Sequence, residues 1–131
     1  MKKQSRKNIV KKLDNVFSQY IRLRNADEHG NTECFTCGKK DHWKRLQCGH
    51  FMSRKNYSTR WSEANCQVQC AACNVFRYGE QYVFGTNLDK KYGKGTADEL
   101  YKASREIVKL SNDDLNEKID LYQTKLQDFS M

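Results

Sequence analysis

The chain has 131 residues, with 24 lysines and arginines against 16 aspartates and glutamates and a formal net charge of +8. We expect one compact domain at this length. The mean hydropathy of −0.96 and the lack of a long apolar run exclude a membrane span, which needs about 20 apolar residues. The basic N-terminus leads into no apolar stretch, so we expect no secretory signal and a cytosolic location. In a reducing compartment the six cysteines more often bind metal than form disulfides.

Positive charge is concentrated at the N-terminal end. Residues 1–24 contain eight lysines and arginines and one carboxylate, whereas residues 95–131 contain five basic and eight acidic side chains. A pI near 9.2 with one strongly basic end is typical of a nucleic-acid-binding protein. A tail that only increases solubility is the alternative that charge alone leaves open.

Hydrophobic periodicity gives a coarse order of elements. Apolar residues at helical spacing predict an amphipathic helix over residues 7–24, with lysines on its other face. From residue 32 to residue 74 cysteines and short segments replace this periodicity, and we expect a small ββα unit organised by a metal ion. A further helix is predicted over residues 71–84.

The C-terminal part shows two further helix starts. Residues 96–99 have the spacing of a capping box, and residues 111–114 also resemble a helix N-terminus. We expect these two helices to pack as a hairpin. The fold class is therefore α+β, with a basic N-terminal helix (1–30), a metal-bound core (31–95) and a C-terminal helical hairpin (96–131) in one compact domain.

Four cysteines form two CxxC pairs, Cys34–Cys37 and Cys70–Cys73. Each CxxC places two thiolates on a tight turn, and two such turns complete the tetrahedral sulfur site that suits Zn²⁺. Four protein ligands leave no position for water, so one structural zinc site is predicted. Unligated buried thiols or a redox pair are the alternatives. The other two cysteines, at positions 48 and 66, lack this spacing, and we interpret them as small buried apolar residues.

A histidine and two asparagines, His50, Asn65 and Asn74, are interleaved with the CxxC pairs. This order resembles the HNH (ββα-metal) nuclease superfamily in its His-Asn-Asn variant, with a treble-clef-like core. The resemblance implies that His50 is the general base that activates water for attack on a phosphodiester, because the pKa of an imidazole lies near neutrality. It also implies that Asn65 orients the imidazole, and that Asn74 helps to hold a catalytic Mg²⁺ or Mn²⁺.

The residue before the histidine departs from that pattern. Many HNH proteins have a metal-binding aspartate there, whereas this chain has Gly49. Gln47 could supply an oxygen from two residues earlier, and Asp41 or His42 could approach from the preceding loop. Without the surrounding motif, His50 would more commonly be a packed histidine.

Longer segments resemble a narrower family. They are residues 12–24, 34–38, 48–54, 59–61, 65–74 and 91–93, which are similar to the NinG/Rap recombination nucleases of lambdoid phages. The resemblance implies a structure-specific endonuclease acting on branched intermediates, including Holliday junctions and D-loops, in the bacterial cytoplasm. Phage or host recombination proteins are then expected partners, and symmetric cutting of a junction would require a homodimer.

Basic residues near the histidine are candidates for contacts with DNA phosphates. Arg54, Lys55 and Arg60 lie between His50 and Asn65, and the first helix adds Lys7, Lys11, Arg22 and Arg24. Tyr57 and Trp61 offer stacking on an unpaired base, although Trp61 equally fits a core aromatic. A non-catalytic zinc-knuckle DNA-binding module, or an adaptor that recruits recombination proteins, is the alternative function.

Overall fold

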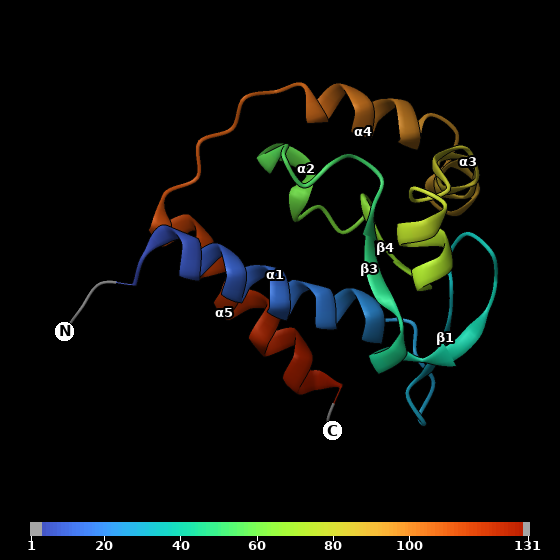
Figure 1. The fold of residues 1–131 in the computed structure, drawn as a ribbon. Coiled ribbons are helices and arrows are strands. Elements are labelled where there is room, and N and C mark those ends of the chain that lie inside the picture. Colours follow the sequence, from blue (N-terminus) through green and yellow to red (C-terminus); the bar gives the residue numbers. More distant parts are fainter. Residues whose placement is uncertain (1–3, 130–131) are drawn as a thin grey trace.

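The computed structural model describes residues 4–129 (Figure 1). The elements in chain order are α1 (Arg6–Leu23), β1 (Asn31–Glu33), β2 (Lys40–His42), the 3₁₀ turn η1 (Trp43–Arg45), β3 (Gln47–His50), α2 (Tyr57–Arg60), β4 (Cys66–Gln69), the π-helical turn η2 (Ala72–Phe76), α3 (Gln81–Tyr92), α4 (Thr96–Ser104) and α5 (Asn112–Asp128). The architecture is α+β, as predicted. Within the described residues, no helix is long and apolar enough to span a membrane.

The strands form two small antiparallel sheets. β1 pairs with β2, and β3 pairs with β4, with Gln47 opposite Gln69 and His50 opposite Cys66. Side chains alternate along a strand, so residues 48 and 50 of β3 share one face. β4 leads almost directly into η2, which places the end of the hairpin beside a helical turn.

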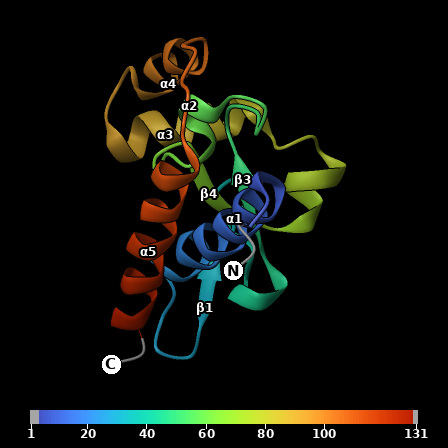
Figure 2. The same cartoon turned by 90° about the vertical axis from the view of Figure 1, so that its left-hand side faces the viewer.

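The largest apolar cluster joins the two ends of the chain. α1 follows an N-cap serine at position 5, whose hydroxyl accepts the Asn8 N–H, and its apolar face packs on α5 (Figure 2). The buried residues of this cluster include Leu13, Phe17 and Ile21 from α1 and Leu115 and Ile119 from α5. Full burial of such a side chain contributes about 1.5–3 kcal/mol, so this contact fixes α1 against the body.

The predicted C-terminal hairpin is wrong. α4 packs on α2 and α3, with Leu100 against Phe84 and Leu88, whereas α5 packs on α1. A connection without helix or strand over residues 105–111 separates them (Figure 1). Each apolar stripe therefore marked a helix correctly, but a stripe shows only that a face is buried and not which element buries it.

The two predicted helix N-termini are capped in different ways. Ser111 and Asp114 form a complete capping box at α5, as predicted. At α4 the N-cap is Gly95, with no side-chain cap, and the Thr96 hydroxyl donates to the Gly93 carbonyl instead. The capping-box prediction for residues 96–99 is therefore wrong.

The helix predicted over residues 71–84 is broken in two. η2 ends at Phe76 and α3 begins at Gln81. Between them Tyr78, Gly79 and Glu80 have φ values of 54°, 86° and 49°, which lie in the left-handed region that a right-handed helix excludes.

Candidate metal centre and active-site pocket

The four cysteines of the CxxC pairs converge on one point. Their sulfur atoms, from Cys34, Cys37, Cys70 and Cys73, all lie within 4.8 Å of one another, and the Cys37 and Cys70 sulfurs are 3.7 Å apart. A tetrahedral zinc site with Zn–S bonds of about 2.3 Å requires sulfurs about 3.8 Å apart. The cluster can therefore hold a zinc ion, as the spacing predicted.

The cluster links the two sheets. Cys34 and Cys37 lie in the turn between β1 and β2, whereas Cys70 directly follows β4 and Cys73 lies in η2. Burial opposes ionisation of the Cys34 thiol, but hydrogen bonds from the Thr36 hydroxyl and from backbone amides lower its pKa to about 6. One thiolate is thus favoured at neutral pH, whereas burial raises the pKa of Cys37 to about 12 and also raises that of Cys73.

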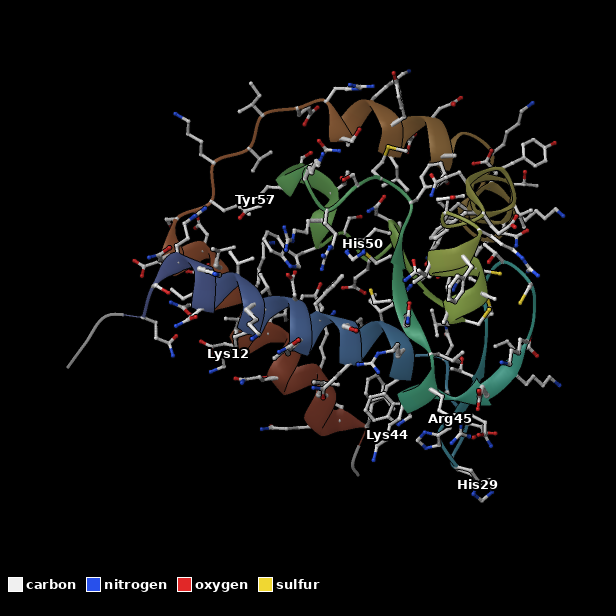
Figure 3. All side chains as sticks on the ribbon, in the orientation of Figure 1. Lys12, His29, Lys44, Arg45, His50 and Tyr57 are labelled. Carbon is white, nitrogen blue, oxygen red and sulfur yellow. The ribbon has the colours of Figure 1, made fainter. Side chains whose placement is uncertain are left out.

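A separate pocket of about 590 Å³ opens beside His50. Five residues that the sequence analysis selected line this pocket: Arg22, Gln47, His50, Arg54 and Asn74. In Figure 3, His50 lies on the side of β3 that faces α1 and α2. The structure therefore brings the proposed base and both proposed ligands of the catalytic metal to one cavity.

The imidazole of His50 is held by the backbone. Its Nε2 lies 3.1 Å from the Arg60 carbonyl oxygen, and since a carbonyl only accepts, Nε2 carries the proton and Nδ1 keeps its lone pair. Burial, with the positive charges of Arg54 and Arg60 adding to it, lowers the pKa of His50 to about 4. The imidazole is therefore neutral at physiological pH and can accept a proton.

Asn65 acts differently from the expectation that it hydrogen-bonds to the imidazole. Its side chain is completely buried, with Oδ1 accepting the Met52 N–H at 2.8 Å and Nδ2 donating to the carbonyls of Met52 and Thr59. Its backbone oxygen accepts the Phe51 N–H. Asn65 thus fixes the C-terminal end of α2, which carries the Arg60 carbonyl, and it orients the imidazole only through that segment.

Asn74 and Gln47 meet at the wall of the pocket. The Asn74 Nδ2 donates to the Gln47 Oε1 at 2.8 Å. Asp41 and His42, the alternative ligands named from sequence, do not line the pocket. Both have other partners: Asp41 accepts from the Arg45 guanidinium at 2.6 Å, and the His42 ring accepts the Lys44 N–H.

The sequence analysis missed Asp14 of α1, which is the one carboxylate among the residues lining this pocket. Its Oδ1 accepts hydrogen bonds from Arg60 Nε at 3.1 Å and from Trp61 Nε1 at 2.9 Å. The available signal was that Asp14 is the one acidic residue within residues 1–24. Trp61 itself is buried in the main core, which supports the core interpretation over base stacking.

The predicted DNA-contacting residues fall into three groups. Two of them form contacts inside the fold: Arg24 donates to the Cys66 carbonyl and Gln67 Oε1, and Arg60 pairs with Asp14. Arg22 lines the pocket while donating to Ser18 and to the Trp43 carbonyl. The exposed residues are Lys7, Lys11, Arg54 and Lys55.

Gly49 is explained by its neighbour across the sheet. A Cβ at this position would overlap the side chain of Gln69, which is completely buried and donates to the Thr36 hydroxyl and the Gly79 carbonyl. The aspartate of the HNH pattern therefore has no space here.

Gly49→Ala is accordingly expected to lower the free energy of unfolding by about 1–3 kcal/mol, the usual cost of overpacking. Urea denaturation measures this change. The same substitution in a Gln69→Ala background is the control and should cost less, because the overlapping atoms are gone. An unchanged denaturation midpoint in Gly49→Ala alone would contradict the assignment.

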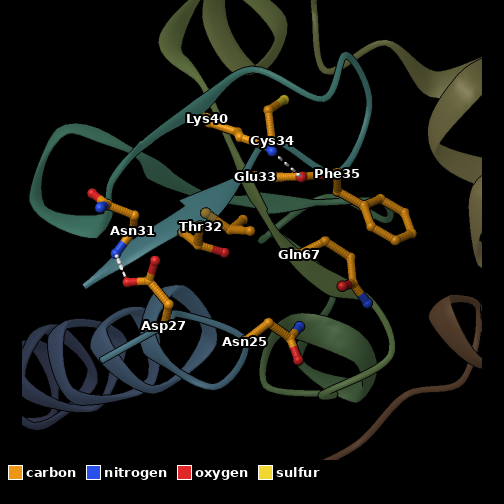
Figure 4. Close-up of a pocket in the computed structure, with 10 residues that line it drawn as sticks. Asn25, Asp27, Asn31, Thr32, Glu33, Cys34, Phe35, Lys40 and Gln67 are labelled. Carbon is orange, nitrogen blue, oxygen red and sulfur yellow. Dashed lines mark hydrogen bonds and ion pairs between the residues drawn. The ribbon is translucent and has the colours of Figure 1, made fainter. Parts of the chain in front are cut away.

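A second cavity, of about 530 Å³, lies beside β1 (Figure 4). Cys34 is the one predicted site residue in its lining. The Asp27 carboxylate accepts the N–H groups of His29 and Asn31, and the bond from Asn31 is the main cause of its lowered pKa. These contacts shape the turn before β1, so we assign no site there.

Fold and site together define a small α+β protein with a four-cysteine cluster that can hold a metal ion and a separate polar pocket. Residues 1–131 match the family described as "Bacteriophage Lambda NinG protein". The chain therefore belongs to the NinG family, which implies a recombination-related function. No curated protein and no solved structure matches the chain.

Proposed function

We propose that this protein is a metal-dependent DNA endonuclease of the HNH class that cleaves branched recombination intermediates, such as Holliday junctions and D-loops, in the cytoplasm of the bacterial host. The observation that carries the proposal is the pocket lined by His50, Gln47 and Asn74. It lies beside an antiparallel hairpin that is followed by a helical turn and anchored at a four-cysteine cluster, the arrangement that the ββα-metal name describes.

The chemistry assigned to the pocket is hydrolysis of a phosphodiester. The neutral His50 accepts a proton from water at Nδ1 while Nε2 stays bonded to the Arg60 carbonyl. The oxygens of Asn74, Gln47 and Asp14 around the pocket are the hard ligands that Mg²⁺ or Mn²⁺ takes. Such an ion would supply positive charge to the reacting phosphate and the leaving oxygen.

Basic side chains border the pocket on two sides. Lys11, Ser18 and Arg22 recur at helical spacing along α1, and Ser18 and Arg22 line the pocket, so the exposed Lys11 and Lys7 continue the same face. Arg54 and the exposed Lys55 lie in the loop after β3. We assign these cations to the DNA backbone, where they would fix register without reading sequence.

One observation favours the alternative of a non-catalytic zinc-knuckle DNA-binding module. The proposed metal ligands already bind protein groups, since Gln47 accepts from Asn74 and Asp14 accepts from Arg60. A binding module needs no free ligand there. An adaptor for recombination proteins would in addition bind DNA with little dependence on salt, whereas contacts to phosphates weaken steeply as salt rises.

A cleavage assay separates these functions. Purified protein is incubated with a labelled four-way junction, a linear duplex or a single strand, in Mg²⁺, Mn²⁺ or EDTA. The proposal predicts cleavage that requires the added cation and is fastest on the junction. Binding to the junction without cleavage in either cation would overturn the nuclease assignment in favour of the binding module. Because symmetric cutting needs two active sites, the proposal also predicts a dimer on the junction, measured by sedimentation.

A further inference from the structure

Cys48, His50 and Cys66 form a second group of metal-binding donors. Cys48 and His50 share one face of β3, and Cys66 is paired with His50 across the hairpin. One donor atom from each residue lies within 4.8 Å of the other two. The group therefore differs from the four-cysteine cluster in residues and in position. It contains Cys48 and Cys66, which from sequence alone were interpreted as small buried apolar residues.

The donor set determines which metal fits. Two thiolates and one imidazole are the ligands of Cys₂His zinc sites, in which three protein donors leave a fourth position open. Sulfur donors disfavour Mg²⁺, which prefers oxygen. A divalent cation of borderline softness, such as Zn²⁺, is the chemical match.

The three residues differ in burial, so the site is closed on one side and open to the pocket on the other. Cys66 is completely buried, whereas Cys48 and His50 line the pocket of about 590 Å³. An ion would reach the donors through that pocket, and its open position would face the same cavity. An entry path of this kind is one of the features required of a credible metal site.

Neighbouring groups support the donors. The Arg60 carbonyl lies 3.1 Å from His50 Nε2 and 3.4 Å from the Cys66 sulfur, and metal-binding histidines usually donate their second N–H to such an acceptor. Burial raises the pKa of the Cys66 thiol well above its usual value, and the Arg24 guanidinium, which donates to the Cys66 carbonyl at 2.8 Å, offsets part of that effect.

We propose that Cys48, His50 and Cys66 bind a second Zn²⁺, and that this ion inhibits the protein. Coordination occupies the imidazole lone pair, so that His50 no longer accepts a proton from water. The inhibitory part rests on the proposed nuclease function, whereas the existence of the zinc site does not.

Metal titration tests the site itself. The full chain, stripped of metal and kept reduced, is titrated with Co²⁺ and followed by its thiolate charge-transfer and ligand-field absorption. We expect two equivalents for the natural chain and one for Cys48→Ala and for Cys66→Val, with circular dichroism confirming that each variant is folded. One equivalent for the natural chain, or two for both variants, would overturn the site.

Cleavage tests the inhibition separately. Junction cleavage in Mn²⁺ is compared for protein loaded with one and with two equivalents of Zn²⁺, and the ratio of the two rates is taken for the natural chain and for Cys66→Val. We expect at least a tenfold loss in the natural chain and a ratio near one in the variant. Equal rates in the natural chain would overturn the inhibition. Two bound Co²⁺ with no cleavage under any condition would overturn the nuclease proposal and leave the second site standing.

Discussion

Cys73→Ser is expected to release the zinc ion of the four-cysteine cluster and to lower the free energy of unfolding by at least about 4 kcal/mol, a size typical of losing a structural metal. Cys73 is completely buried, and its cluster joins the β1–β2 turn to the end of β4 and η2. Apart from the cysteines, Leu46 and Val68 are the buried apolar residues of that region. Because zinc binding is coupled to folding, loss of one thiolate should loosen both sheets.

The measurements are zinc per chain, determined with a chromogenic chelator in a Cys66→Val background that removes the second donor group, and urea denaturation of protein loaded with one equivalent of zinc. Cys48→Ser is the matched control, since Cys48 is half-buried and lies outside the four-cysteine cluster. It should retain that zinc and change stability by less than about 1 kcal/mol. A Cys73→Ser protein with natural stability and one tightly bound zinc would remove Cys73 from the ligand set.

Local sequence patterns predicted the long helices near both ends of the chain and the cysteine cluster. The apolar spacing of residues 7–24 and the capping serine at position 111 gave α1 and the start of α5 closely. The two CxxC pairs predicted the cysteine cluster because each pair brings two sulfurs together within a single turn. In each case the decisive contacts are formed by residues close together in the sequence.

Features that depend on distant contacts were not predictable in the same way. The apolar stripe of α4 can pack on α3 as well as on α5, so the sequence did not exclude a hairpin of α4 with α5. The break before α3 depends on positive φ at Tyr78 and Glu80, and tyrosine and glutamate are not residue types that predict positive φ. Local patterns thus located most helices, whereas packing decided their partners.

The same division applies to the pocket. His50 and Asn74 were selected from motif order, and Gln47 was selected as a replacement for the missing aspartate; all three line one cavity. The partners of Arg24, Arg60 and other polar side chains depend on which strands and helices meet, and so does the neighbourhood of Cys48 and Cys66. The pairing of His50 with Cys66 follows from a strand register that the sequence does not reveal.

His50→Ala is expected to slow junction cleavage at least about 100-fold, the lower end of the usual contribution of a general base. The imidazole is the group in the pocket whose lowered pKa, about 4 because of burial, keeps it neutral and able to accept a proton. Junction binding should change little, because the basic residues assigned to phosphates lie on α1 and in the loop after β3. Single-turnover cleavage in Mn²⁺ and a gel-shift titration measure the two quantities.

His29→Ala is the matched control for this prediction. His29 is exposed in the loop before β1 and lines neither the pocket beside His50 nor the cysteine cluster, so its loss should leave the cleavage rate within about twofold. Thermal unfolding of both variants shows whether His50→Ala, which removes a partly buried ring, still folds. A folded His50→Ala that cleaves at the natural rate would exclude His50 as the base. Among the residues lining the pocket, Asp14 is the other candidate base, and it is already paired with Arg60.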